Sequence, residues 1–188
     1  MRIIGGQFKG KKILEPIDKI TRPLKDLVKE SIFNIIIHSK KFEIKIEGSY
    51  ILDLFSGVGS FGLEALSRGS EHVTFVENYT EVLKILKTNI NNFKVNNKCN
   101  LIEKNLFENF SFDQIDNKFN IIFIDPPFKS KDVNFLLSEI HKAKILKKNS
   151  LIILHRHSKE NLTLNDNLKI LEEKTYGISK IIFANYSS

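Results

Sequence analysis

The sequence predicts an α/β fold in which an N-terminal β-hairpin and helix precede a doubly wound sheet of about seven strands, the last of them antiparallel. From Tyr50 onward, short apolar runs alternate with amphipathic stretches, and strands that alternate with helices form parallel sheets with right-handed crossovers. Residues 121–124 are apolar at every position, as in strands that are covered on both faces. Two β-prone runs near the C-terminus meet at Tyr176-Gly177, so they predict a closing hairpin that adds the antiparallel strand.

The composition is that of a single globular domain. The chain has 188 residues, of which 41% are hydrophobic and 27% charged. We therefore treat residues 1–188 as one domain and residues 1–40 as its hairpin and helix extension. The sequence contains no run of about 18 apolar residues, so no membrane span is predicted. The first residues lack the apolar region of a signal peptide, so we expect a cytoplasmic protein. A lone cysteine, Cys99, excludes an internal disulfide and a cysteine-cluster metal site.

Positive charge marks the first segment of the chain. The net charge is +7, from 29 Lys and Arg against 22 Asp and Glu, which favours a polyanionic partner, although a lysine-rich composition could account for part of this charge. Residues 2–4 and 12–14 are β-prone runs separated by glycines, so they predict a hairpin. We favour contact between this hairpin and a nucleic-acid backbone; the alternative is a solvated edge hairpin blunted by lysines. Before the first acid, Glu15, its basic residues are Arg2, Lys9, Lys11 and Lys12.

A helix is predicted from Leu24 to about Ser39, with Pro23 suited to its start. Arg22, just before this helix, could reach a phosphate or cap a neighbouring element. The apolar face of the helix is predicted to consist of Leu24, Leu27, Val28, Ser31, Ile32, Ile35 and Ile36. The opposite face is predicted to carry Lys25, Asp26, Lys29 and Glu30.

The rest of the chain reads as alternating strands and helices. We predict strands over residues 50–55, 72–77, 99–103, 119–124 and 151–155, with helices over residues 60–68, 80–93 and 133–143. The closing hairpin is predicted over residues 168–172 and 178–185. Parallel strands bring their carboxyl ends to one edge of the sheet, which is where ligands of such folds bind.

A glycine-rich loop follows the predicted strand over residues 50–55. Gly57-Val58-Gly59-Ser60-Phe61-Gly62 satisfies the G-x-G-x-x-G pattern of dinucleotide sites, and Glu77 follows Gly57 by twenty residues. A carboxylate at that place suits any ligand with a ribose diol, so Glu77 does not separate NAD from S-adenosylmethionine. Glu77 could alternatively be an exposed acid at the end of a strand.

Two acidic motifs do separate these cofactors. Asp53 completes the pattern D-x-F-x-G-x-G, and its carboxylate would lie poorly beside a pyrophosphate but suits an ammonium and a sulfonium group. Asp125-Pro126-Pro127-Phe128, at the end of the predicted strand 119–124, has no role in hydride transfer. It could also be a plain turn. Together the two motifs favour S-adenosylmethionine over NAD.

These motifs resemble those of a known family. D-L-F-S-G-V-G-S-F-G-L-E-A-L-S-R-G, the D-P-P-F tetrad and the opening M-R-I-I-G-G are similar to the bacterial 16S (small-subunit) ribosomal RNA guanine-N2 methyltransferases, class I enzymes with a Rossmann-like fold. The resemblance extends through Arg22-Pro23 and Glu30-x-x-Phe33-Asn34 to Tyr176-Gly177. It implies S-adenosylmethionine as cofactor, a guanine exocyclic N2 amine as acceptor, ribosomal RNA or the small ribosomal subunit as partner, and a monomer.

The motifs and the resemblance assign roles to individual residues. Asp125 and the rigid carbonyl of Pro126 would accept hydrogen bonds from the guanine amine, and Phe128 would stack on a flipped base. The predicted catalytic residues are Asp125, Pro126, Pro127 and Phe128. The predicted cofactor contacts are Asp53, Phe55, Ser56, Gly57, Gly59, Glu77, Asn78 and Asn105, of which Asn105 could equally be a turn residue. The predicted RNA contacts are Arg2, Lys9, Lys11, Lys12 and Arg22, and no metal site is predicted.

The chain also departs from the family. Leu24 stands where the family has threonine, and Leu27 and Lys29 stand where it has arginines. We expect these changes to affect RNA contact more than the chemistry. The strand end at residues 155–157 often contains a glutamate in the family, whereas here His155-Arg156-His157 could form a basic lip over the RNA or a solvated strand end.

Other functions fit parts of the pattern. The D-P-P-F tetrad marks amino-group methyltransferases in general, so adenine N6 or a protein glutamine amide are alternative acceptors. A non-catalytic RNA-binding module would also explain the basic hairpin, but an intact Asp125 argues against it. An NAD-dependent oxidoreductase is disfavoured by Asp53.

Overall fold

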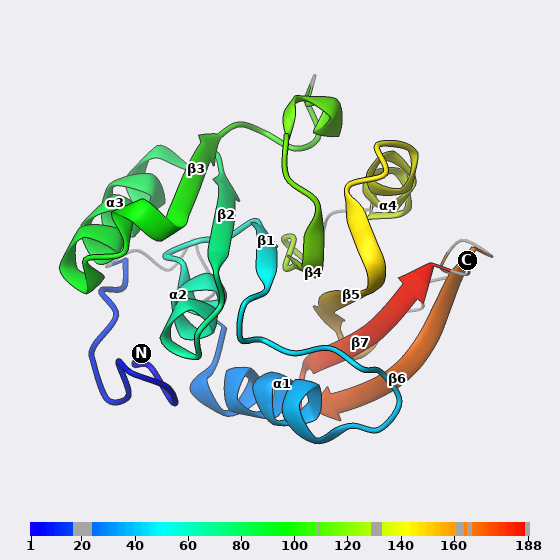
Figure 1. Ribbon diagram of the computed structural model, residues 1–188, viewed down its shortest axis with the longest axis horizontal. Helices are drawn as coiled ribbons and strands as arrows, with labels where there is room; N and C mark the ends of the chain where they lie inside the picture. The colour runs from blue at the N-terminus through cyan, green and yellow to red at the C-terminus, as the bar shows by residue number, and fades with distance from the viewer. Residues whose placement is uncertain (17–23, 109, 129–132, 161–163, 165–166, 187–188) are drawn as a thin grey trace.

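The computed structural model describes residues 1–16, 24–108, 110–128, 133–160, 164 and 167–186, arranged as shown in Figure 1. At its centre is a seven-stranded sheet with the order β3-β2-β1-β4-β5-β7-β6. The strands are β1 (Tyr50–Leu54), β2 (His72–Glu77), β3 (Cys99–Glu103), β4 (Phe119–Ile124), β5 (Leu146–His157), β6 (Leu168–Tyr176) and β7 (Ser179–Tyr186).

The strand directions confirm the predicted α/β fold. Strands β3, β2, β1, β4 and β5 are parallel, and β7 runs antiparallel to both β5 and β6. The chain enters the sheet at β1, adds β2 and β3 on one side, and then crosses to β4 on the other. This reversal leaves a crevice at the carboxyl ends of β1 and β4, the place where open α/β sheets bind ligands.

Helices cover both faces of the sheet, which explains why its strands are apolar at consecutive positions. On one face, Ile51 of β1 packs in a cluster with α1 (Asp26–His38), α2 (Ser60–Ser67) and α3 (Thr80–Phe93). On the other, Leu52 packs in a cluster with α4 (Val133–Lys142) and the short turn η2 (Phe112–Gln114). A second short turn, η1 (Asn96–Lys98), leads into β3. Within the described ranges, no helix has both the length and the apolar character needed to cross a lipid bilayer.

The largest difference from the predicted element boundaries is at β5. This strand begins at Leu146 and ends at His157, whereas the sequence predicts only residues 151–155. The polar run 147–149 concealed its first half, where the register with β4 is irregular. The closing hairpin is also longer than predicted, because β6 continues to Tyr176.

The predicted faces of α1 are wrong at two positions. Leu27, expected in the core, is 69% exposed, whereas Lys29, expected on the polar face, is fully buried. Lys29 Nζ donates to Arg2 O at 2.7 Å and lies 3.7 Å from Glu64 Oε2. Burial lowers the pKa of Lys29, and the carboxylates of Glu64 and Asp26 oppose that shift. Lys29 is therefore not a peripheral or RNA-facing residue but a buried link between helices and the N-terminal segment.

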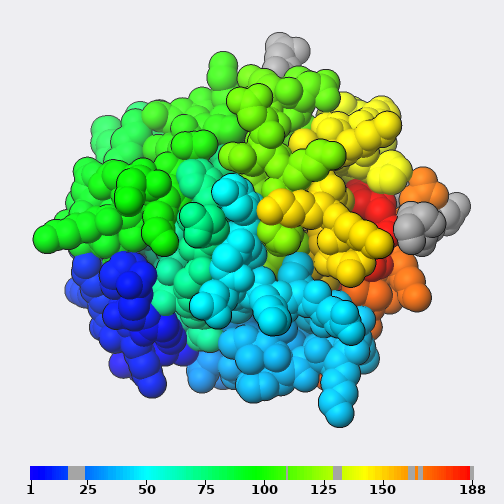
Figure 2. All heavy atoms as spheres, in the orientation of Figure 1, coloured from blue at the N-terminus to red at the C-terminus, as the bar shows by residue number. Residues whose placement is uncertain are grey.

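Residues 1–16, which we call the N-terminal segment, fold back on themselves but do not form two β-strands. An isolated bridge joins Arg2 and Lys12, so the predicted turn-back is correct and the predicted strands are not. Ile3 and Ile13 are buried in the main core, and the side chain of Asn89 on α3 bonds both backbone groups of Leu14. The segment packs on helices rather than at a sheet edge, which overturns the edge-hairpin alternative. Figure 2 shows it in dark blue at the surface.

Candidate active site

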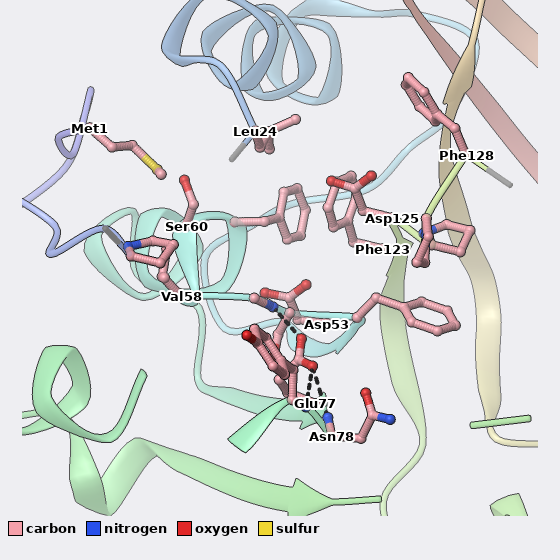
Figure 3. Close-up of a pocket in the computed structure, with 18 residues that line it drawn as sticks. Met1, Leu24, Asp53, Val58, Ser60, Glu77, Asn78, Phe123, Asp125 and Phe128 are labelled. Carbon is pink, nitrogen blue, oxygen red and sulfur yellow. Dashed lines mark hydrogen bonds between the residues drawn. The ribbon is translucent and has the colours of Figure 1, made fainter. Parts of the chain in front are cut away.

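A pocket of about 460 Å³ lies at the carboxyl ends of β1, β2 and β4, within the range of small-molecule sites. Figure 3 shows side chains from the glycine loop, the end of β2 and the D-P-P-F tetrad around it. The lining residues that the sequence predicts are Asp53, Phe55, Ser56, Gly57, Glu77, Asn78, Asp125, Pro126, Pro127 and Phe128. The two motifs are thus two walls of one pocket.

The loop after β1 has an unusual backbone that turns it over the end of β2. Phe55 has φ of 58°, in the left-handed region that aromatic residues rarely adopt, and its ring lies 5.4 Å from that of Phe107. Ser56 N donates to Val76 O at 3.0 Å. Gly57 has φ of 54°, and a Cβ added there would have no neighbour within 4 Å. The glycine therefore provides a left-handed backbone that faces open space and is accessible to a ligand.

Gly62 sets the close packing of α2 on β2. A Cβ at this position would lie 2.3 Å from Cε1 of Phe75, so no larger residue fits. In the first turn of α2, the backbone N–H of Gly62 donates to Asp53 Oδ2 at 2.9 Å. The third glycine of the G-x-G-x-x-G pattern therefore fixes both the helix position and the orientation of the Asp53 carboxylate.

Asp53 is a buried acid with one unpartnered oxygen. It is 1% exposed, and its Oδ1 has no hydrogen-bond partner. Burial raises the pKa of Asp53 well above its usual range; the charges of Asp125 and Glu77 raise it further, whereas the hydrogen bond from Gly62 lowers it. Three carboxylates thus face one pocket, and a cationic ligand would relieve their repulsion. This donor set fits the ammonium and sulfonium groups of S-adenosylmethionine.

Glu77, at the end of β2, holds the glycine loop. Its Oε2 accepts from Gly57 N at 2.9 Å, and its Oε1 accepts from Asn78 N and Tyr79 N at 2.8 and 2.9 Å. It is half-buried, so the alternative of an exposed strand-end acid is wrong. Because each carboxylate oxygen can accept more than one hydrogen bond, Glu77 can hold the loop and still accept from a ribose hydroxyl.

The Asp53→Asn variant should be more stable than the wild type near neutral pH and bind the cofactor more weakly. An acid whose pKa is raised by folding loses stability as the pH rises from its ordinary value, here 3.8, through its folded pKa. Asparagine removes this cost, so we expect a gain of about 1–3 kcal/mol at pH 7 that disappears toward pH 4. Urea denaturation across this pH range measures the gain. Cofactor affinity by calorimetry should fall by about 10–100-fold; unchanged affinity would exclude Asp53 as a cofactor contact.

The D-P-P-F tetrad directly follows β4 and is held from β5. Asp125 N donates to Leu54 O at 3.3 Å, so the tetrad begins in register with β1. Arg156 of β5 donates to Pro127 O and Phe128 O at 3.4 and 3.3 Å. The tetrad is therefore fixed by two rigid prolines and a buried guanidinium, which is more than a plain turn requires.

The end of β5 is buried, which neither interpretation of His155-Arg156-His157 anticipated. His155 and Arg156 are 2% and 1% exposed, so they form neither a basic lip nor a solvated strand end. Arg156 is paired with Glu160, with Nε to Oε2 at 2.8 Å and Nη2 to Oε1 at 2.6 Å. The rings of His155 and His157 lie edge-on to Phe128 at 5.6 and 5.0 Å. These three residues of β5 therefore contact the tetrad and help to hold it in place.

Some predicted residues lie outside this pocket. Gly59 and Asn105 are not among its lining residues, and the Asn105 side chain accepts from Phe107 N at 3.1 Å, as a turn residue does. Contact between Asn105 and a cofactor therefore stays a prediction. The basic residues of the N-terminal segment are exposed and do not line the pocket either, and Arg22 lies outside the described residues. Among the residues with described positions, no group of three or more His, Cys, Asp or Glu could hold a metal ion.

Other pocket residues could not be assigned from the sequence. In the sequence, these residues share only their proximity to a motif or to the start of the chain. Most of them are apolar, and an apolar residue is equally typical of the hydrophobic core. They are Met1, Pro16, Leu24, Val58, Ser60, Phe61, Tyr79 and Phe123.

Comparison with known proteins agrees with this geometry. Residues 1–185 match a family model described as Conserved hypothetical protein 95. Ribosomal RNA small subunit methyltransferase D of Haemophilus influenzae is 33% identical over 179 residues, which cover 95% of this chain and 90% of that protein. The solved structure of the Escherichia coli protein yhhF aligns with a TM-score of 0.81 and 27% identity, covering 100% of this chain and 98% of that one.

More distant structures show the same fold. SMU.776, solved in complex with SAH, aligns with a TM-score of 0.64 and 18% identity over 83% of this chain and 48% of that one. At this identity the likeness concerns the fold alone. The distant structures show that the chain has the Rossmann-like fold of S-adenosylmethionine-dependent methyltransferases. The family model and the relative in Haemophilus influenzae show that the chain belongs to the Conserved hypothetical protein 95 family, with the small-subunit ribosomal RNA methyltransferases D that it resembles.

Proposed function

We propose that this protein methylates the exocyclic N2 amine of a guanine in small-subunit ribosomal RNA, with S-adenosylmethionine as the methyl donor. The observation that carries the proposal is that one pocket contains both a set of cation-binding carboxylates and the D-P-P-F tetrad. The first part suits the donor and the second suits an amine. The relative in Haemophilus influenzae is named as a ribosomal RNA small subunit methyltransferase, which supports RNA as the substrate class.

The residues that would hold the cofactor are Asp53, Glu77 and the backbone of the glycine loop. Asp53 has a buried, unpartnered Oδ1 that can accept from an ammonium group, and Glu77 can accept from a ribose hydroxyl. S-adenosylmethionine, when bound, supplies an activated methyl group on a positively charged sulfur. The three carboxylates of the pocket favour that charge over a neutral thioether, which is the form left after transfer.

The tetrad would prepare the amine. The lone pair of the guanine N2 is delocalised into the ring, so the amine is a poor nucleophile until its N–H groups are held out of the ring plane. Asp125 offers a carboxylate and Pro126 a backbone carbonyl as acceptors for those N–H groups. Phe128 offers a ring on which a flipped base can stack, worth about 1–3 kcal/mol. Catalysis would then consist mainly of positioning the amine for in-line transfer.

RNA contact is proposed for the N-terminal segment, which borders the pocket through Met1 and Pro16. Arg2, Lys9 and Lys12 are exposed there. Lys11 is partly engaged, since its ammonium lies 4.4 Å from the Phe93 ring centroid, so we expect it to contribute less to RNA binding. We further propose a monomeric enzyme in the cytoplasm, where the small ribosomal subunit is found.

Replacing Arg2, Lys9 and Lys12 together by glutamine should reduce the salt dependence of RNA binding. Each lost contact with single-stranded phosphate lowers the slope of log K against log salt by about 0.7, so we expect a decrease of about 2. Filter binding at several salt concentrations measures the slope. The matched control replaces three exposed lysines, Lys142, Lys144 and Lys148, by glutamine. They lie near the amino end of β5, away from the carboxyl ends of the strands where the pocket lies. Equal slopes for the two triple variants would remove the N-terminal segment from the RNA interface.

The function itself is tested with methyl-labelled S-adenosylmethionine and four acceptors: naked 16S ribosomal RNA, assembled small subunits, DNA and protein. We expect label on RNA, and digestion of that RNA to nucleosides should yield N2-methylguanosine. Label on adenine N6, on DNA or on protein glutamine, with none on guanine, would contradict the proposal. The comparison of naked RNA with subunits also identifies the preferred form of the substrate.

A further inference from the structure

A buried histidine lies against the acid of the tetrad. Strands β4 and β5 are parallel with Ile124 opposite Leu154, so the residues that follow, Asp125 and His155, emerge side by side. His155 Nδ1 lies 2.8 Å from Asp125 Oδ1, and the two side chains are 3% and 17% exposed. The preceding residues of β5, Ile152 to Leu154, are buried and aliphatic. His155 is therefore the first polar residue after the aliphatic part of this strand, and it lies next to the tetrad.

We propose that His155 is a positioning residue for Asp125. The contact between Nδ1 and Asp125 Oδ1 would, with the proton on Nδ1, fix the plane of the carboxylate and leave Oδ2 for the N–H of the acceptor amine. This inference rests on the proposed function, because it specifies how the acceptor amine is aligned.

The surroundings of Asp125 explain why the carboxylate needs such a partner. Two other carboxylates, Asp53 and Glu77, line the same pocket, and their charges disfavour a fixed third one unless a donor holds it. The Asp125 side chain has two rotatable bonds, and its backbone is anchored through Leu54 O. The His155 ring is itself fixed, since Phe128 lies edge-on to it with ring centroids 5.6 Å apart. A rigid donor therefore orients an otherwise mobile acceptor.

Two substitutions separate this role from simple packing. His155→Asn keeps an N–H donor near the position of Nδ1 in a smaller side chain, whereas His155→Leu keeps the volume and removes the donor. We expect His155→Leu to lower kcat by about 10–100-fold with KM for the cofactor changed less than about 3-fold. His155→Asn should retain kcat within about 5-fold of the wild type. If His155 only filled space, the leucine variant would be the active one and the asparagine variant the impaired one.

The experiment measures kcat and both KM values with labelled cofactor and ribosomal RNA, with thermal denaturation to show that each variant is folded. The control is His72→Leu, the same substitution at the amino end of β2, which should leave kcat unchanged. Wild-type kcat in His155→Leu, or equal losses in the leucine and asparagine variants, would overturn the inference.

A second measurement does not depend on the substrate. In protein labelled with ¹⁵N at histidine, the His155 Nδ1 resonance should be that of a protonated nitrogen and should shift in Asp125→Ala. An unprotonated Nδ1 would overturn the inference whatever the RNA assay gives. Failure of the wild type to methylate any RNA, together with a protonated Nδ1, would instead contradict the proposed function and retain the His155–Asp125 pair.

Discussion

The Asp125→Asn variant should lose about 10²–10⁴-fold in methyl transfer to RNA while it still binds the cofactor. Asparagine has the same shape and keeps one carbonyl oxygen for His155, which lies 2.8 Å from Asp125 Oδ1. The other carboxylate oxygen becomes an NH₂ group, and a donor then faces the N–H donors of the amine. The loss should therefore appear in kcat, because the aligned amine is what the variant cannot produce.

The Asp53→Asn variant is the matched comparison, since the same chemical change is made in the same pocket. It should raise KM for the cofactor, whereas Asp125→Asn should lower kcat. Single-turnover kinetics with labelled cofactor, combined with calorimetry, separate the two effects. Wild-type kcat in Asp125→Asn would show that the tetrad is structural. Loss of cofactor binding in that variant, with no separate effect on kcat, would assign Asp125 to the cofactor rather than to the amine.

The sheet was predictable because the information for it is local. Most of the parallel strands contain a short apolar run, and each crossover helix has its own periodicity, so neither depends on a distant partner for its recognition. The pocket was predictable for the same reason. Glycine, aspartate and proline at fixed offsets after a strand specify backbone geometry, and parallel strands bring those offsets to one edge of the sheet.

Buried polar residues were not predictable, because their partners come from other elements. Lys29 reads as a surface lysine in the sequence of α1, and its burial depends on Arg2 O and on Glu64 of α2. His155 and Arg156 read as a charged strand end, and their burial depends on Asp125 and Glu160. A polar side chain can be buried only where partners replace its water, and a sequence pattern in one element does not identify those partners.

The Glu64→Leu variant should lose about 3–5 kcal/mol of unfolding free energy. Glu64 is fully buried on α2. Its Oε2 accepts from Ile4 N at 2.7 Å, and its Oε1 accepts from Gly5 N at 2.8 Å and from Arg68 Nε at 2.7 Å. Leucine would leave these donors without a partner and Lys29 without a buried counter-charge. Glu81→Leu, at an exposed ion pair with Lys84, is the control and should change stability by less than about 1 kcal/mol.

A double-mutant cycle with Lys29→Met tests whether the two buried charges act as a unit. Because each single substitution already removes the interaction between the two charges, which lie 3.7 Å apart, the double variant should be less destabilised than the sum of the two, by about 1–3 kcal/mol. Urea denaturation followed by circular dichroism gives the four free energies. Additive losses would mean that Lys29 is held by Arg2 O and Ser60 Oγ rather than by Glu64.

Since Glu64 anchors residues 4 and 5, and Met1 and Pro16 line the pocket, Glu64→Leu should also weaken cofactor binding. That effect would link a charge on α2 to the site through the N-terminal segment.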